Sequence, residues 1–453
     1  MERDAIDFGT MHIPRLFVKL FVPTLLGMMF GAALNLADGI FVGQGVGSDA
    51  LAAINIAAPV FLAAPGLALL FGSGVSVVSA IHLSHGNVKA ASINVTQAFT
   101  VSSTLMGLVC LLVYAFPRQT AYLFGGSDQL MPLVLDYLLW VMPGIVGCML
   151  TMIGMFVIRL DGSPRYAMYA EIIPSVINIV LDYVLVFPAH MGVKGAAVAT
   201  SISQLLGAAM VLFYLLKRRQ TLYLYRPKFS RKSIRLTMRN VGYMSRLGFS
   251  NFIGEAAMAA MMVTGNYMFI GRLHEDGVAA FSVACYMFPL VFMFGSAIAQ
   301  SSLPIVSYNH GQGNEGRIRA TFRLSMVLAI VFGLLISILG VWFCRPLLHL
   351  FLSGSHAYVL AEHGFPMFAT SFVFFTLNIV LIGYYQSVER ASEAIVFMLL
   401  RGFVLMIPCF VLLPHFLGDD GLWWAVPLSE GVTFFIILIY GLYRFSSHRG
   451  HGK

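Results

Sequence analysis

Four oxygen-bearing side chains lie inside long apolar runs of the sequence, where a charge is costly. Asp38 and Asp182 each fall about 7 to 8 Å from the end of a predicted helix, at about 1.5 Å rise per residue. Thr200 lies at the same depth in the next run, and Asn178 is one turn from Asp182 on the same helix face, which Glu171 continues. A carboxylate at bilayer depth costs at least about 2.5 kcal/mol, so this pair needs a proton or a cation. These residues predict an all-oxygen site for H⁺ or Na⁺; the alternative is hydrogen bonding between helices without a bound ion.

Five other charged residues also fall in or near apolar runs. Asp136 and Glu171 lie near helix ends, where they could be interfacial, and Glu255 has no partner at its own depth in the second half of the chain. Arg401 and Glu430 are predicted to form a structural salt link between the last two helices.

The helices that position these residues are predicted from composition and run length. Of the 453 residues 58% are hydrophobic, against 28 Lys and Arg and 20 Asp and Glu, which excludes an ordinary soluble protein. A membrane-spanning helix needs about 20 apolar residues. The sequence therefore predicts an all-α polytopic membrane protein with twelve spans at 16–43, 51–81, 93–115, 131–157, 166–187, 195–216, 246–271, 279–306, 321–343, 362–385, 394–413 and 421–443.

The two halves of the sequence are related by an internal repeat. At an offset of 227 residues Asp49 falls on Asp276 and Arg118 on Arg345, and matches of this kind outside the apolar runs argue against chance. Because six helices are an even number, both copies insert in the same orientation, as in transporters built from two pseudo-symmetric six-helix bundles in a parallel repeat. The predicted divisions are an N-lobe (1–216), a basic linker (217–245), a C-lobe (246–443) and a tail (444–453).

Most Lys and Arg residues lie on one side of this layout. The predicted outer loops hold only Arg118, Lys194, Arg272 and Arg345, which predicts a multi-pass protein of the cell membrane, a bacterial inner membrane, with both termini cytoplasmic. The range 217–246 has ten basic residues and no acid; it favours an anchor on an anionic leaflet over recognition of one particular lipid. We expect membrane lipids as partners, no nucleic acid and a monomer. No cleaved signal is predicted before the first helix.

The residues of the first paragraph, with their surroundings, resemble the MATE (multidrug and toxic compound extrusion) family, and the layout is nearest its bacterial DinF-like and MepA-like branch. The resemblance rests on the run NLADGIFVG from Asn35 to Gly43, on the segment from Asn178 to Asp182, and on Thr200. It implies an antiporter that exports amphipathic, often cationic organic compounds in exchange for inward H⁺ or Na⁺. It also implies a coupling-ion site, with a supporting tyrosine and a helix-bending proline, at Asp38, Asn178, Asp182, Thr200, Tyr137 and Pro23.

The sequence also departs from the family pattern in the second half. The run 362–385 carries no acid, and Glu255 is about a turn away from the familiar acidic position, so the cation chemistry is assigned to the first half. The 25 Met and 37 Phe residues suit an adaptable substrate cavity, although for any single Met ordinary packing against lipid and core is the favoured explanation. The candidates for this cavity are Asn35, Glu255, Met258, Met261, Met262 and Met293.

Two other functions compete with multidrug antiport. The first is a flippase for lipid-linked precursors or polysaccharide, which would need a strongly charged cavity, whereas Arg401 is the single basic residue well inside a predicted helix. The second is an intramembrane enzyme, because Asn178 and Asp182 faintly resemble prenyltransferase aspartate motifs. No second acidic motif follows, and His82 and His85 lie near a predicted loop. We therefore expect a transporter that is not an enzyme and needs no cofactor beyond its coupling ion.

Overall fold

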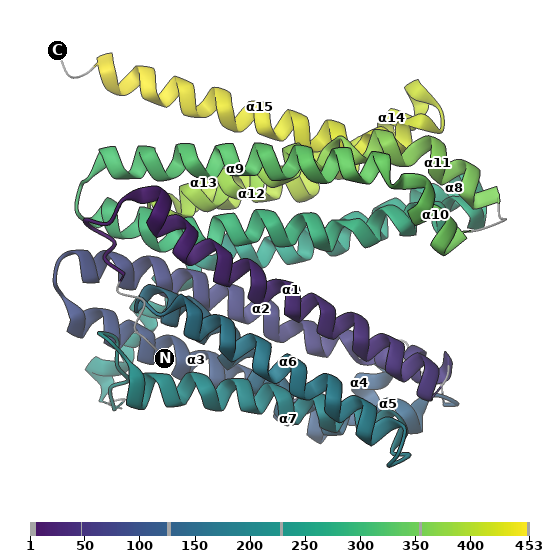
Figure 1. Cartoon of the computed structure of the whole chain (residues 1–453), viewed down its shortest axis with the longest axis horizontal. Helices are drawn as coiled ribbons and strands as arrows, with labels where there is room; N and C mark the ends of the chain where they lie inside the picture. Colours follow the sequence, from purple (N-terminus) through teal and green to yellow (C-terminus); the bar gives the residue numbers. More distant parts are fainter. Residues whose placement is uncertain (1–5, 47, 125–127, 227–229, 353–355, 451–453) are drawn as a thin grey trace. The chain divides into compact units, whose positions relative to one another are not determined.

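The computed structural model of the chain describes residues 6–46, 48–124, 128–226, 230–352 and 356–450. Throughout these ranges the regular structure is helical, and no strand occurs in them. Two compact units are present: residues 1–248 with 307–315, and residues 249–306 with 316–453 (Figure 1).

The first unit holds seven α-helices, one short π-helical segment and the first part of the long helix α8. The helices are α1 (Ile13–Gly45), α2 (Ser48–Ser84), α3 (Val88–Ala115), α4 (Pro117–Leu123), α5 (Met131–Leu160), α6 (Pro164–Val186), α7 (Gly192–Phe213) and η1 (Tyr214–Arg218).

The second unit holds most of α8 and the helices that follow it. These are α8 (Arg231–Gly311), α9 (Glu315–Trp342), α10 (Cys344–Leu352), α11 (His356–Ala369), α12 (Ser371–Ser387), α13 (Ala391–Leu399), η2 (Leu400–Leu405), α14 (Met406–Leu417) and α15 (Asp420–Gly450).

The predicted membrane fold is confirmed. Among the described residues, 11 helices are long and apolar enough to cross a membrane. One of them, α8, is 81 residues long and is broken at His274, whose φ of 57° and ψ of −152° are not helical. This break falls between the predicted spans 246–271 and 279–306, so α8 supplies two of the twelve predicted crossings.

Close helix packing at glycine holds the first unit together. Helix α5 packs against α2 and α7, while α6 packs against α1 and α7. A Cβ atom at Gly147 of α5 would lie 2.7 Å from the backbone oxygen of Gln204 on α7, and one at Gly144 would lie 2.7 Å from Cα of Ser201. Small residues permit this approach of two backbones, which is common between membrane helices. The contact fixes α7 beside α5 at the level of Thr200.

We predict that Gly147→Ala destabilises the protein by about 1–3 kcal/mol, because the added methyl group meets backbone atoms that cannot rotate away. Thermal unfolding of the purified protein in detergent measures the change. The matched control is Gly107→Ala in α3, where a Cβ atom would meet nothing within 4 Å. Since alanine favours a helix over glycine by about 1 kcal/mol, the control should leave the melting temperature equal or higher. Equal losses in both variants would contradict the packing argument.

A carboxylate in the turn between α5 and α6 holds the first part of the predicted linker in place through hydrogen bonds. Asp161 is buried, and its two oxygens accept the backbone N–H groups of Gln220, Thr221 and Leu222 at 2.7–2.8 Å. The hydroxyl of Tyr214 donates to the same carboxylate at 2.7 Å. The segment after η1 is therefore packed as part of the first unit.

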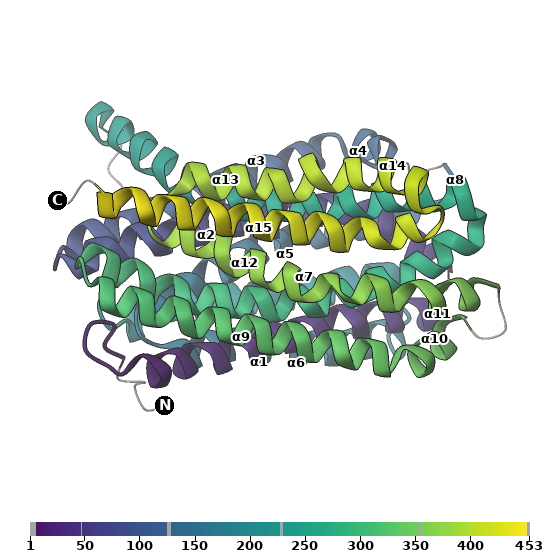
Figure 2. The ribbon, with the colours of Figure 1, turned by 90° about the horizontal axis from the view of Figure 1, so that it is seen from above.

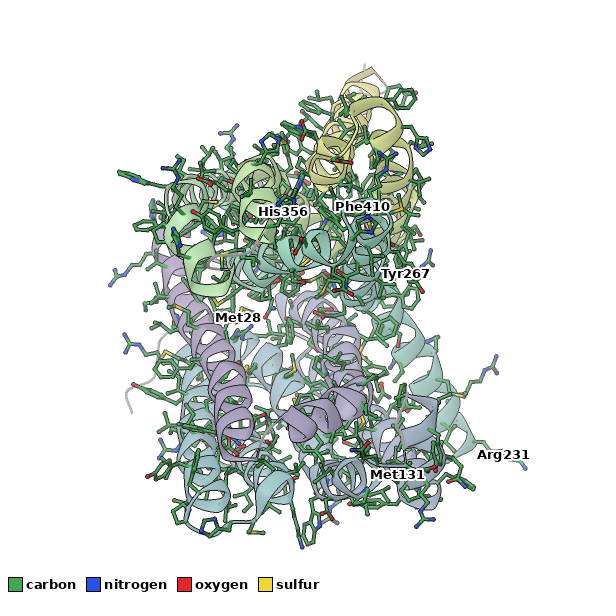
Figure 3. The ribbon with its side chains drawn as sticks, turned by 90° about the vertical axis from the view of Figure 1, so that its right-hand side faces the viewer. Met28, Met131, Arg231, Tyr267, His356 and Phe410 are labelled. Carbon is green, nitrogen blue, oxygen red and sulfur yellow. The ribbon has the colours of Figure 1, made fainter. Side chains whose placement is uncertain are left out.

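Aromatic side chains form the core of the second unit. Phe281 stacks on Phe269 with ring centroids 4.6 Å apart and meets the edge of Phe410, which Figure 3 labels. Trp423 of α15 packs edge-on against Phe269 and leaves no room for a side chain at Gly364 of α11. Helix α15 lies along α12 and α14, as Figure 2 shows. This packing anchors the helices that carry the second unit's buried ion pair.

Candidate cation site

Four of the five predicted coupling residues line one cavity inside the first unit. Asp38 of α1, Tyr137 of α5, Asn178 of α6 and Thr200 of α7 surround a space of about 150 Å³. The fifth residue, Asp182, has no exposed surface and interacts electrostatically with Asp38. The convergence of these helices at one depth is what the sequence predicted, while the binding role of the residues stays a prediction.

Asn178 connects two of these helices. With its amide oriented to suit its neighbours, the nitrogen donates to Oδ2 of Asp182 at 2.9 Å, and the oxygen accepts the backbone N–H of Thr200 at 3.1 Å. The turn between α6 and α7 brings Thr200 back to this level through two residues with positive φ, His190 (51°) and Gly192 (58°). Asn178 thereby links the carboxylate of Asp182 on α6 to the backbone of α7 at Thr200.

The electrostatics of the site favour a bound positive charge. One oxygen of each acid, Oδ1 of Asp38 and Oδ1 of Asp182, is buried and has no hydrogen-bond partner among the described residues. A buried acceptor without a partner loses its hydrogen bonds to water and forms none in the protein. This loss costs about 1–3 kcal/mol of stability, and more when the acceptor is charged. A proton on one carboxylate, or a hard cation that prefers oxygen ligands, would reduce the negative charge of the pair and offset the cost of its burial. The residues present therefore fit either coupling ion.

The cavity also contains residues that the sequence did not single out. Gln204 lines it from α7, and its apolar wall consists of Leu34, Ile54, Ala58 and Phe61. Gln204 lies one turn from Thr200, so the i, i+4 spacing on a helix could have indicated it. The wall residues carry no such signal, because apolar side chains are common on every span of this chain.

The predicted hinge residue is inside α1. Pro23 lies ten residues into this 33-residue helix and removes the backbone N–H that would bond the carbonyl of Lys19. The next residue, Thr24, is buried, and its hydroxyl has no hydrogen-bond partner in the part of the chain that the structure describes. The side chain of Asn35, a predicted cavity residue on the same helix, lies outside the described residues.

The other predicted cavity residues belong to α8 and differ in their surroundings. Glu255 is half-buried, and Met258 packs against the aromatic core of the second unit. Met293 is buried, while Met262 is 44% exposed. Met261 is a buried member of that same core. Core packing thus accounts for Met258 and Met261.

Within the described ranges, no three or more His, Cys, Asp and Glu side chains gather closely enough to hold a metal ion. A cation in the first unit would therefore depend on the mixed set of carboxylate, amide and hydroxyl oxygens described above.

Comparison with known protein families gives the same duplicated layout. The family model described as MatE matches this chain twice, over residues 23–184 and over residues 251–412. The chain belongs to the MATE family of membrane transporters. The two matched segments correspond to the two halves of the repeat found in the sequence, so this MATE protein carries one copy of the family domain in each half.

Curated relatives and solved structures are similar over nearly the whole MATE chain. A protein of Shewanella oneidensis named FAD transporter is 26% identical over 425 residues, 92% of each chain. The multidrug export protein MepA of Staphylococcus haemolyticus is 23% identical over 429 residues, again 92% of each chain. An outward-facing multidrug resistance MATE transporter has a TM-score of 0.87 at 22% identity, covering 96% of both chains. A MOP superfamily transporter from Pyrococcus furiosus has a TM-score of 0.86 at 21% identity, with the same coverage. These structures share the fold with this chain.

Proposed function

We propose that this MATE protein is a cation-coupled antiporter that exports amphipathic, often cationic organic compounds in exchange for inward H⁺ or Na⁺. The observation that supports this proposal is the pair of orphaned carboxylate oxygens, Asp38 Oδ1 and Asp182 Oδ1, in one buried site of the first unit. Acids in membrane-spanning helices mark ion pathways and proton relays, because their burial has to be offset by function.

The site couples ion binding to the position of α1. Asp38 is carried by α1, which contains Pro23 as its proposed hinge, whereas its partners Asp182 and Thr200 are carried by α6 and α7. The empty pair of carboxylates repels, and a bound H⁺ or Na⁺ removes this repulsion. The loaded and empty sites therefore favour different positions of α1, and a ligand shifts the population by its difference in affinity for the two states. In this cycle the ion enters from outside and drives the release of the exported compound.

The buried ion pair of the second unit argues against a phosphate-bearing cargo. Arg401 is buried, and its Nε donates to Oε1 and Oε2 of Glu430 at 2.7 and 2.9 Å, so its charge is already neutralised. A flippase for pyrophosphate-linked precursors would need buried positive charge that is free to bind phosphate. The relatives named multidrug export protein MepA support the export of drugs, whereas the relative named FAD transporter makes an anionic dinucleotide the cargo to test against them.

The remaining parts of the proposal concern the cell. Both termini are cytoplasmic, in agreement with the excess of Lys and Arg on that side, and the protein lies in a bacterial inner membrane with lipids as its neighbours. It works as a monomer, is not an enzyme and needs no cofactor other than the coupling ion.

We expect purified protein in liposomes to move a fluorescent cationic dye when an H⁺ gradient or a Na⁺ gradient is imposed. Dye fluorescence is followed under each gradient separately, and under an equal membrane potential without either gradient as a control. Movement that follows one gradient identifies the coupling ion. Transport of FAD in place of several cationic dyes would reverse the proposed cargo, and gradient-independent movement of lipid-linked sugars would replace the antiporter by the flippase.

A further inference from the structure

We infer that Glu171 forms a second binding position for the coupling cation in the first unit, nearer the N-terminal ends of α1 and α6 than the Asp38 and Asp182 site. The inference rests on the proposed function, because it concerns the route of the same ion. Nothing in the resemblance to the family assigns a role to this residue; its surroundings in the structure do.

The carboxylate of Glu171 lies in a notch on α1 that two glycines form. A Cβ atom at Gly27 would lie 2.6 Å from Oε2 of Glu171, and a Cβ atom at Gly31 would lie 3.1 Å from Oε1. Gly27 and Gly31 are one turn apart on the same face of α1, next to Met28, which Figure 3 labels. Both oxygens of Glu171 thus lie close to the α1 backbone, in the space that is open because glycine has no side chain.

This notch lies on the same helix faces as the first cation site. Asp38 follows Gly27 by the same number of residues as Asp182 follows Glu171, and α1 packs against α6. At about 1.5 Å per residue, Glu171 is about 16 Å from Asp182 along the helix. Ser175 and Asn178, both buried, lie between them on the same face of α6. A polar stripe therefore connects the two acidic positions along the contact between α1 and α6.

The charge of Glu171 is incompletely compensated. Its carboxylate is half-buried and makes no ion pair or hydrogen bond with any residue that the structure describes. The charged and titratable groups that act on it electrostatically are Arg159 and Cys148, both on α5, and α1 contacts it at Gly27 and Gly31. The Arg159 guanidinium is itself buried, lies 5.7 Å from the ring centroid of Phe156, and donates to the sulfur of Met155. A carboxylate held this way in a membrane lobe favours a proton or a cation.

Because of its position, Glu171 serves as an intermediate binding position for the ion as it moves inward from the Asp38 and Asp182 site. The notch is on α1, a few residues from Pro23, so a movement of α1 that empties the Asp38 site also changes the contact of Glu171 with Gly27 and Gly31. If the ion is a proton, the O–H bond of the Asp182 carboxyl breaks, the proton passes along the polar stripe in which the hydroxyl of Ser175 lies between the two acids, and an O–H bond of Glu171 forms, so charge and atoms balance. If the ion is Na⁺, it exchanges one set of oxygen ligands for another.

The test uses Glu171→Gln, which keeps the size of the side chain and removes the charge. We expect gradient-driven dye transport in liposomes to fall by about tenfold, whereas dye exchange at equal concentrations without any gradient stays within about twofold of wild type. Gly27→Ala should weaken gradient-driven transport in the same direction, because its methyl group pushes the carboxylate out of the notch. The matched control is Asp136→Asn, an exposed acid on α5, which should behave as wild type.

The outcomes separate this inference from the proposed function. If Glu171→Gln transports normally under a gradient while Asp38→Asn does not, the second position is refuted and the antiporter stands. If neither variant loses gradient-driven transport, the antiporter itself is refuted. A loss of both gradient-driven transport and exchange in Glu171→Gln would indicate a structural role and would also overturn the inference; Glu171→Asp, which keeps the charge, should then fail equally, whereas a cation position predicts partial recovery in that variant.

Discussion

Asp38→Asn should abolish gradient-driven transport, by about 100-fold or more, while the protein still folds and binds dye. Asparagine is close in size to aspartate but cannot take up a proton or hold a cation by its charge. The orphaned oxygen Oδ1 of Asp38 would become a neutral amide group, and the partner Asp182 would no longer be repelled. The site would then stay in one state whatever the ion gradient. Initial rates of dye movement in liposomes under the coupling gradient measure the effect.

The controls for this experiment come from the same lobe. Asp136→Asn removes an exposed acid of α5 and should keep the wild-type rate. Asp182→Asn should match Asp38→Asn, and the double variant should be no worse than either single one, because the two carboxylates act as one unit. Retained gradient-driven export by Asp38→Asn at normal expression would refute the proposed coupling site.

The candidate site could be predicted from the sequence because charge inside an apolar run is rare and helical spacing is regular. Counting residues from the helix ends places Asp38, Asp182 and Thr200 at one depth and Asn178 one turn away, and the structure brings the four residues to one site. The contact of Glu171 with the glycine notch could not be predicted this way. It depends on the rotation of α6 against α1, which the spacing within a single helix does not give.

Contacts between separate helices could not be predicted from the sequence in the second unit either. The predicted salt link between Arg401 and Glu430 is confirmed, with Nε and Oε1 2.7 Å apart. The sequence did not indicate Asn378, whose amide donates to Glu430 at 2.7 Å, or Phe375, whose ring centroid lies 4.1 Å from the guanidinium carbon of Arg401. Both come from α12, and residues on a separate helix meet the pair only through tertiary packing.

Short helices and breaks were also missed. Helices α4 and α10 were not predicted, because each is too short to give a span, although the repeat had matched Arg118 with Arg345 in these two segments. The run predicted at 394–413 is interrupted in the structure by the π-helical segment η2, which contains Arg401. Such segments are irregular in backbone hydrogen bonding and leave no periodic signal in the sequence.

The buried ion pair of the second unit provides the largest expected effect on stability. Glu430→Ala should destabilise the protein by about 3–5 kcal/mol, because it leaves the Arg401 charge buried without its partner. Both side chains are only 7% exposed, and the amide of Asn378 would lose one of its two acceptors at residue 430, keeping the backbone carbonyl. Thermal unfolding in detergent measures the loss, and Arg401→Ala should be comparably damaging because it leaves the Glu430 carboxylate unpaired.

A double replacement and a surface ion pair serve as the controls for Glu430→Ala. Arg401→Met with Glu430→Met removes both charges and fills the volume, so it should recover most of the stability that either single change loses. The control is Arg345→Ala, since the pair that Arg345 forms with Glu362 is 77% and 34% exposed and should be worth less than about 1 kcal/mol. If the double replacement folds with normal stability but loses transport, the pair serves the transport cycle; if it keeps both, burial and charge neutralisation fully explain why these two residues occur inside the second unit. A Glu430→Ala loss as small as that of Arg345→Ala would contradict the burial of the pair.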